Sequence, residues 1–365
     1  MNVQPTMRQI AKVAGVSHVT VSLALRHDRT IPKRTIERIE AIAAEMGYSP
    51  DPEVSKLMAR IRKKKTPGFQ GTLIWLTAWE SPEAWRRWLA DERFHLGAEE
   101  RAAQLGYRLE SFWYREPSLK PQRIASIFRE RGIEGILVAA LPDGMHRLEF
   151  EWEHFASVSL GYSLFEPQLN CAESAGRFNL ELALQTVRMR GYQRPGLLLS
   201  HGMDERVRRA WSGMYLSDQL DRPVRERVPL LFKKEVTRAL FERWFERHRP
   251  DVVISNEYEV DEWLEDLGLK VPSEIGIVRM DTAPIGRLPL EKIRWRPSGV
   301  YYSGINQKFE QIGAAAVDTL VGQILNGERG IPKDSKLVQI RGEWLDGETL
   351  LDRTVETGVS PKPGR

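Results

Sequence analysis

The sequence predicts a small all-α head followed by an α/β body of two lobes built on parallel sheets. Residues 7–46 contain three short helical patterns around tight turns, whereas beyond residue 70 apolar runs alternate with amphipathic stretches. A chain of 365 residues is too long for one ordinary domain. The first 65 residues hold 13 Lys and Arg against 6 Asp and Glu, which leaves 41 against 44 for the rest. This basic head on a slightly acidic body indicates that one end of the protein binds a polyanion.

The head begins with MRQIAKVAGVSHVTVSLALR, residues 7–26, which has the pattern of two helices around a sharp turn. Gly15 suits the turn and Ser17 can cap the second helix by accepting a hydrogen bond from a free backbone N–H. The residues that recur at helical spacing are Ile10, Ala11 and Ala14 in the first helix and Val21, Ala24 and Leu25 in the second. We interpret this stretch as a helix-turn-helix; a helical hairpin from another kind of core is the alternative.

A third helix follows, and it strengthens that interpretation. Pro32 suits a first turn, and Gly47 ends a pattern in which Ile36, Ile39, Ala43 and Met46 share one face. A further short helix is expected over residues 53–60, with Asp51 as its cap. The Lys63, Lys64 and Lys65 run that comes next is expected to be a solvated tether.

The motifs AKVAGVS, TVS and GYSP, with Leu57 beyond them, resemble the DNA-binding head and hinge of the LacI/GalR family of bacterial repressors. The resemblance implies that His18, Val19 and Leu23 meet base edges, while Ser17, Thr20 and Ser22 steady the helix against phosphates. It also places Thr6, Arg26 and Thr35 at the DNA. Leu23 departs from the polar or cationic side chain of many relatives, so only apolar base contacts are expected there.

The same resemblance makes Leu57, with Met58 beside it, the residue that the paired hinge helices push into the minor groove. The hinge carries the acidic Asp51-Pro52-Glu53, where some relatives have small neutral residues. Leu57 could instead pack on the neighbouring domain, as single leucines often do.

The body alternates between predicted strands and helices. Strands are expected over 71–77, 107–114, 135–141, 156–161, 196–200, 251–255 and 275–280, and helices over 91–105, 119–131, 175–190, 206–220, 233–248 and 305–325. This alternation predicts parallel sheets with helices on both faces, and ligands of such sheets bind beyond the carboxyl ends of the strands.

RPDVVISNE, VPSEIGIVRMD and the late GINQKFEQIGAAAVDTLVGQILNGERGIP resemble the sugar-binding half of LacI/GalR proteins, whose fold is that of periplasmic binding proteins. The resemblance implies three crossings between lobes, expected near Gly161, Pro297 and Gly327. The expected division is a head at 1–50, a hinge and linker at 51–66, an effector-binding and dimerisation domain at 67–350, and a tail at 351–365. Lobe 1 would hold about 67–162 and 300–326, and lobe 2 about 163–297 and 327–350.

The candidate effector-binding residues lie at strand exits. Asp281 ends the IGIVRMD strand where family members hold an effector hydroxyl or N–H, although it could also be a structural cap. Trp79 is placed to stack on a pyranose, while Trp75, Trp85 and Trp88 are assigned to packing. Asn256 and Tyr162 are weaker candidates. The family arginine before the second-lobe helix is replaced by Ala210, and Arg209 is its nearest substitute.

No catalytic constellation is found. The sequence lacks a glycine-rich phosphate loop and a nucleophile elbow, its seven histidines lack metal-ligand spacing, and Cys171 is its single cysteine. No enzyme, cofactor or metal site is therefore expected. The absence of an apolar leader or a membrane-spanning run predicts a cytoplasmic protein that has no membrane partner.

These observations predict a homodimeric DNA-binding transcription regulator that binds a near-palindromic operator and responds to a small effector, a sugar or related metabolite, between its lobes. Two alternatives stay open: a cytosolic sugar sensor without DNA function, and a nonspecific architectural DNA binder with a decayed cleft.

Overall fold

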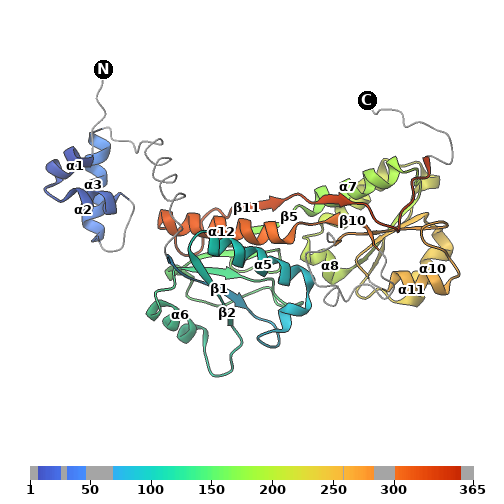
Figure 1. Ribbon diagram of the computed structural model, residues 1–365, viewed down its shortest axis with the longest axis horizontal. Coiled ribbons are helices and arrows are strands. Elements are labelled where there is room, and N and C mark those ends of the chain that lie inside the picture. The colour runs from blue at the N-terminus through green and yellow to red at the C-terminus, as the bar shows by residue number, and fades with distance from the viewer. Residues whose placement is uncertain (1–6, 26–30, 47–68, 258, 283–300, 355–365) are drawn as a thin grey trace, which may run out of the picture.

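The computed structural model describes residues 1–365 except 1–6, 26–30, 47–68, 258, 283–300 and 355–365. The head consists of α1 (Met7–Ala14), α2 (His18–Ala24) and α3 (Lys33–Glu45), which enclose an apolar core of their own. In Figure 1 these helices stand apart from the body, and the predicted hinge lies outside the described residues. The three predicted head helices are confirmed.

Lobe 1 is a six-stranded sheet in the order β11-β5-β4-β3-β1-β2, in which all neighbours are parallel. Its elements are β1 (Gly71–Thr77), η1 (Ala84–Arg87), α5 (Leu89–Gln104), β2 (Tyr107–Trp113), α6 (Pro121–Glu130), β3 (Gly135–Val138), η2 (Trp152–His154), β4 (Ala156–Leu160), β5 (Asn170–Ser174), α12 (Phe309–Asn326) and β11 (Leu337–Ile340). Buried apolar residues gather into two clusters, one containing Trp75 and the other Phe128.

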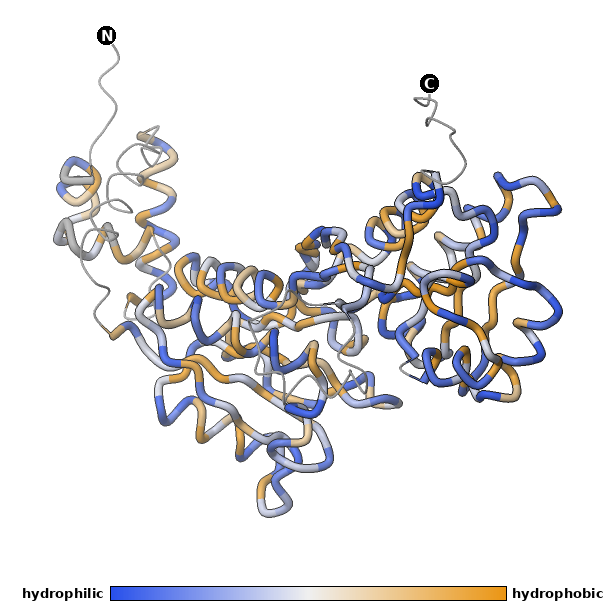
Figure 2. Tube along the Cα trace, turned by 45° about the vertical axis from the view of Figure 1, so that its right-hand side comes forward, coloured by the Kyte–Doolittle hydropathy of each residue, from blue (hydrophilic) through white to orange (hydrophobic). Residues whose placement is uncertain are grey.

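Lobe 2 is a second six-stranded sheet in the order β12-β10-β9-β8-β6-β7, in which only the β10–β12 pair is antiparallel. Its elements are α7 (Gly176–Met189), β6 (Pro195–Ser200), α8 (His201–Arg206), α9 (Ala210–Leu220), η3 (Val224–Glu226), β7 (Leu231–Lys233), α10 (Arg238–His248), β8 (Val252–Ser255), α11 (Val260–Asp266), β9 (Gly276–Arg279), β10 (Ser303–Asn306) and β12 (Glu343–Leu345). Figure 2 shows helices whose hydropathy alternates along the chain, as amphipathic helices require.

The chain crosses between the lobes three times, but not where the sequence predicted. The crossings lie between β5 and α7, between β10 and α12, and between β11 and β12, near residues 175, 307 and 341. The predicted crossings near Gly161, Pro297 and Gly327 are wrong because 170–174 and 337–340 are strands of lobe 1, while 303–306 is a strand of lobe 2. Strand patterns do not reveal which sheet a strand joins, since pairing is set by distant residues.

The three crossings are bonded to one another. The backbone N–H of Ala175 donates to the carbonyl oxygen of Ile340 at 2.9 Å, and that of Gly342 to Asn179 Oδ1 at 2.8 Å. Asn306 Nδ2 donates to Glu343 Oε1 at 3.0 Å, and Lys308 Nζ lies 2.9 Å from Glu343 Oε2. The segments that link the lobes therefore form one hydrogen-bonded band.

Several predicted elements need correction. The helix expected over 206–220 is two helices, because Arg208 and Arg209 adopt left-handed backbone angles with φ of 51° and 59°. The helix expected over 233–248 begins at Arg238, and the one expected over 305–325 begins at Phe309 after strand β10. Strand β5 was not predicted because Asn170, Glu173 and Ser174 break its apolar pattern.

Lobe 1 depends on a close crossing of α5 and α12, which lie side by side in Figure 1. A Cβ at Gly97 would lie 1.9 Å from the carbonyl oxygen of Glu310, and one at Gly313 would lie 2.0 Å from that of Phe94. Arg93 joins the helices through Nε and Nη2, 2.8 and 2.7 Å from the two carboxylate oxygens of Glu310. Both side chains are buried, so this bidentate pair is shielded from water.

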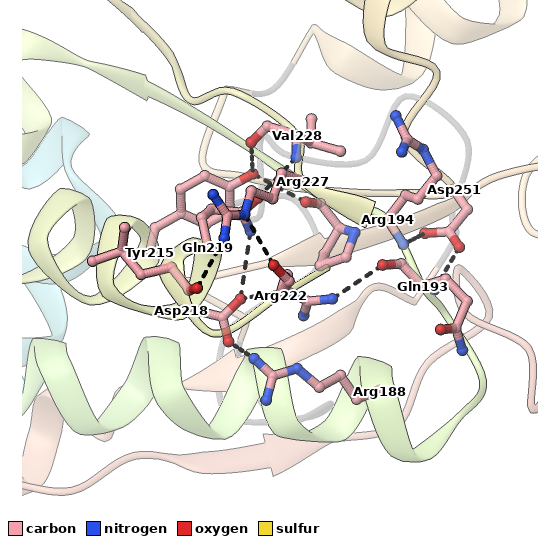
Figure 3. Close-up of polar contacts among 12 residues, drawn as sticks. Arg188, Gln193, Arg194, Tyr215, Asp218, Gln219, Arg222, Arg227, Val228 and Asp251 are labelled. Atoms are coloured by element: carbon pink, nitrogen blue, oxygen red, sulfur yellow. Dashed lines mark hydrogen bonds and ion pairs between the residues drawn. The ribbon is translucent and has the colours of Figure 1, made fainter. Parts of the chain in front are cut away.

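Lobe 2 has an arginine-rich bracket where its strands begin, away from the strand exits (Figure 3). The Tyr215 hydroxyl lies 3.0 Å from the carbonyl oxygen of Pro195 and 2.7 Å from that of Val228. Arg222 donates from Nε to Asp218 Oδ2 at 2.6 Å and from Nη1 to the Gln193 carbonyl oxygen at 3.0 Å. Backbone carbonyls and Asp218 together hold these side chains, which indicates a structural role.

Replacing Gly313 by Ala tests the close crossing. The added methyl group cannot fit beside the Phe94 carbonyl, so we expect a loss of about 1–3 kcal/mol or more in the free energy of unfolding, measured by denaturant titration. Gly322→Ala is the matched control on the same helix. No atom lies within 4 Å of its new Cβ, and a gain of about 0.5–1 kcal/mol is expected. Equal stability of the two variants would contradict the packing described.

Candidate functional site

The head presents a capped second helix. Ser17 precedes α2, and its Oγ accepts a hydrogen bond from the Thr20 backbone N–H at 3.0 Å, as the sequence predicted. Gly15 has a φ of +64°, the left-handed conformation that a tight turn requires. Arg38 of α3 donates to the Ala14 carbonyl oxygen at 3.1 Å and so closes the end of α1. The turn is therefore built by local residues and fixed by the third helix.

Packing decides which face of α2 points outward. Val21 and Ala24 are fully buried against Ile10 and Ile39, and Leu25 packs partly against the same core. Leu23 and Thr20 are half-buried, while Ser17 is exposed. The predicted inward set is confirmed, and the opposite face of α2 is left to meet a partner.

The structure describes only some of the predicted DNA-contacting residues. The backbones of His18, Val19 and Ser22 belong to α2, while their side chains are not described. Thr35 is half-buried in the first turn of α3. Thr6, Arg26, Leu57 and Met58 lie outside the described residues.

The strand exits of the two lobes face one another. Arg206, the last residue of α8 in lobe 2, donates from Nη1 to the Leu141 carbonyl oxygen at 3.1 Å and to Asp143 Oδ1 at 2.9 Å, both beyond β3 of lobe 1. The guanidinium carbon of Arg208 lies 4.3 Å from the ring centre of Phe165 and 5.4 Å from that of Tyr162. A small pocket opens between Arg206, Asp143 and Phe165. Lobe 2 therefore reaches across to lobe 1 through two arginines.

The structure uses Trp79 differently from the stacking role predicted for it. Its indole is 6% exposed, and Nε1 donates to the Ala140 carbonyl oxygen at 3.0 Å. Its ring centre lies 5.8 Å from that of the half-exposed Trp88. Trp75 and Trp85 are completely buried, as their assignment to packing predicted. Trp79 thus packs within lobe 1 and leaves little ring surface for a ligand.

The other four predicted effector residues have different settings. Asp281 Oδ1 is 3.8 Å from Nε of the buried Arg279, and Asn256 Oδ1 accepts the Met280 backbone N–H at 3.0 Å. The Tyr162 hydroxyl accepts a hydrogen bond from Gln339 at 3.2 Å. Arg209 is exposed at the start of α9. Asn256 has a structural bond that explains its position, whereas Asp281 and Arg209 keep exposed surface.

Two buried carboxylates that sequence reasoning missed lie at the lobe 1 exits. Asp91, in the first turn of α5, is 1% exposed, and neither of its oxygens has a hydrogen-bond partner among the described residues. Burial raises the pKa of Asp91 to about 7, although the positive charge of Arg206 partly lowers it. Burial likewise raises the pKa of Glu173 to about 8 against the lowering effects of Gln339 and Arg208. An aspartate in a first helical turn ordinarily indicates only a favourable helix dipole, so the sequence carried no signal of burial.

The described part of the chain contains neither a membrane-spanning helix nor a cluster of metal-ligating side chains. None of its helices combines the length and apolar character needed to cross a bilayer. In the same ranges, no group of three or more His, Cys, Asp or Glu side chains is placed to hold a metal ion.

Comparison with known proteins agrees with this geometry. Residues 6–51 match the family model of bacterial regulatory proteins of the lacI family. A search of curated proteins gives no match. Among solved structures, a complex of the transcriptional regulator CelR with cellobiose has a TM-score of 0.52 at 16% identity and covers 94% of this chain and 99% of its own.

The lac repressor dimer bound to operator and the anti-inducer ONPF has a TM-score of 0.51 at 16% identity, with 95% of this chain and 99% of its own covered. A LacI-family protein from Rhizobium etli has a TM-score of 0.54 at 16% identity and covers 77% and 99%. The fold is thus a helical DNA-binding head on a two-lobed body like that of periplasmic binding proteins. The head therefore matches the lacI family model, and the chain as a whole shares the fold of these solved regulators.

Replacing Asp91 by Asn tests its electrostatic setting. A folded-state pKa of about 7 exceeds the ordinary 3.8, so the Asp91 contribution to stability is present below pH 4 and is lost as the pH rises through 7. Asn carries no charge to desolvate. We therefore expect Asp91→Asn to be about 2–4 kcal/mol more stable than wild type at pH 8, and the difference to vanish near pH 4, by urea unfolding. A less stable variant at pH 8 would show that the carboxylate is well bonded.

Proposed function

We propose that this protein is a homodimeric repressor that binds a near-palindromic operator. Binding of a small effector, a sugar or related metabolite, between the lobes would lower or raise its affinity for the operator. The observation that carries the proposal is the Ser17-capped helix-turn-helix, within residues that match the lacI family model, attached to lobes joined by three crossings. CelR was solved with cellobiose, and the lac repressor dimer with operator and anti-inducer, which supports both kinds of partner. A protein that reads chromosomal DNA works in the cytoplasm, and we assign it no catalytic role.

In this proposal each head places α2 in a major groove. His18, Val19 and Leu23 meet base edges, and Leu23 reads a thymine methyl group. Phosphate contacts come from Ser17, Thr20 and Ser22, and Thr6, Arg26 and Thr35 complete the interface. Leu57 and Met58 enter the minor groove from the hinge.

We keep the domain division predicted from the sequence, with the crossings between the lobes near residues 175, 307 and 341. The head covers 1–50, the hinge and linker 51–66, and the effector and dimerisation domain 67–350. Asp281, Arg209 and Tyr162 remain the proposed effector contacts that keep surface on the gap, and Asp91 joins them on the lobe 1 side.

The operator is found by selecting bound fragments from the source genome, and the wedge is tested on it with Leu57→Ala. Losing an apolar side chain that unstacks a base step should weaken operator binding by about 10–100-fold, measured by fluorescence anisotropy. Val13→Ala is the control, because Val13 is 62% exposed on α1, away from α2. Unchanged affinity of Leu57→Ala would contradict the minor-groove role of Leu57.

A salt titration separates this proposal from a nonspecific binder. We expect the selected operator to be bound at least about 1,000-fold more tightly than unrelated DNA at physiological salt, while both affinities fall as salt rises. Equal affinity for the two DNAs would favour an architectural protein, and no binding to either would favour a sensor without DNA function.

A further inference from the structure

The strongest unexplained feature of the body is the Asp91 carboxylate. It lies behind the exit of β1, with 1% of the residue exposed and neither oxygen bonded within the described residues. The positive charge of Arg206 partly lowers the pKa of Asp91, and the Arg206 guanidinium comes from lobe 2 and is bonded to Leu141 and Asp143. Because α5 follows β1, its first turn lies at the carboxyl end of that strand, so Asp91 is buried at the edge of lobe 1 that Arg206 of lobe 2 reaches.

Another buried carboxylate in the same lobe, that of Glu310, has a structural role and differs from Asp91 in its hydrogen bonds. Glu310 is equally hidden, and it accepts two hydrogen bonds from Arg93 at 2.8 and 2.7 Å. Burying a carboxylate without such bonds costs several kcal/mol, so Asp91 weakens the folded protein where it stands. Residues kept at that cost are characteristic of binding sites.

The strand exits hold further carboxylates with little compensation. Glu173 Oε2 and Asp261 Oδ1 are buried without a partner among the described side chains, and burial raises the pKa of both groups. The arginines nearby have other bonds or contacts. Arg279 donates to the carbonyl oxygens of Asn256 and Glu257, and Arg208 lies over Phe165. Three carboxylates at the strand exits thus have buried oxygens without a partner among the described residues.

We propose that Asp91 binds an ammonium group of the effector, which makes the effector an amino-substituted sugar or a similar small polyol amine. An ammonium group brings both the positive charge and the hydrogen-bond donors that this carboxylate lacks. The inference rests on the interlobe site of the proposed function. A neutral sugar could hydrogen-bond to Asp91, but it would leave the charge uncompensated.

The test is isothermal calorimetry on the full chain with a panel of hexoses and disaccharides, each paired with its amino and N-acetylamino forms. We expect an amino form to bind at pH 7.5 at least 100-fold more tightly than its neutral parent or its N-acetyl form. Asp91→Asn should lose that 100-fold preference. Asp318→Asn, an exposed carboxylate on α12 bonded to Arg101, is the matched control and should keep it.

Proton linkage gives a second readout. Below pH 7 Asp91 must release a proton to bind an ammonium group, so the affinity should rise about fivefold between pH 6 and pH 7. The calorimetric heat at pH 6 should also vary with the ionisation enthalpy of the buffer in wild type but not in Asp91→Asn.

Three results would overturn the assignment: equal binding of parent and amino sugars, retention of the preference in Asp91→Asn, or no amino compound bound in the whole panel. Operator binding by the same preparation keeps this separate from the proposed function. An amino sugar that binds through Asp91 without changing operator affinity would uphold the inference and contradict the proposed function.

Discussion

The hydrogen-bonded band between the lobes is the constraint on which the rest of the body depends. The three segments that cross between the lobes lie together, and Asn179, Asn306 and Glu343 bond them to one another. Gly342 sits where a Cβ would lie 2.8 Å from both Asn179 Oδ1 and the Asn306 carbonyl oxygen, so the crossings are as close as the backbone allows. Because the crossings are bonded to one another, we expect the lobes to move by rotation about the band rather than by sliding. Such a rotation would open or close the gap at the strand exits.

Each lobe is rigid enough to transmit that rotation. In lobe 1 the buried Arg93–Glu310 pair and the glycine contacts hold α12 against α5, so the end of β10 in lobe 2 is connected through one crossing to the helix layer of lobe 1. In lobe 2 the arginine bracket around Tyr215 fixes α9 to the strands. A ligand that contacts both lobes can then bias their angle only by binding one arrangement more tightly than the other, and the strength of that bias is its differential affinity.

The sequence predicted most where the causes are local. The turn of the head needs only Gly15 and Ser17, and both behave as expected because a cap and a left-handed residue act within a few positions. The apolar strands β1, β3 and β8 were also predicted, since an uninterrupted apolar run in an alternating chain identifies a buried parallel strand.

The parts that were not predicted depend on residues far apart in the chain. Strand β5 is polar because Asn170 and Glu173 bond to Lys336 and Gln339 around β11, more than a hundred residues later, and pairing with β11 also makes it part of lobe 1. Asp91 lies within the electrostatic reach of Arg206 from lobe 2, and Trp79 is turned inward by a bond to Ala140 on another strand exit. The spacing of residues in the sequence contains no information about contacts between distant segments. The strand exits could therefore be predicted, but the contacts of the side chains at those exits could not.

The central claim is that the gap between the lobes governs DNA binding by the head. The most direct measurement is the affinity of the full chain for its selected operator, with and without a saturating ligand shown by calorimetry to bind in the gap. The account predicts a change of at least tenfold, in one direction or the other. An operator affinity that stays the same while the gap is filled would contradict it.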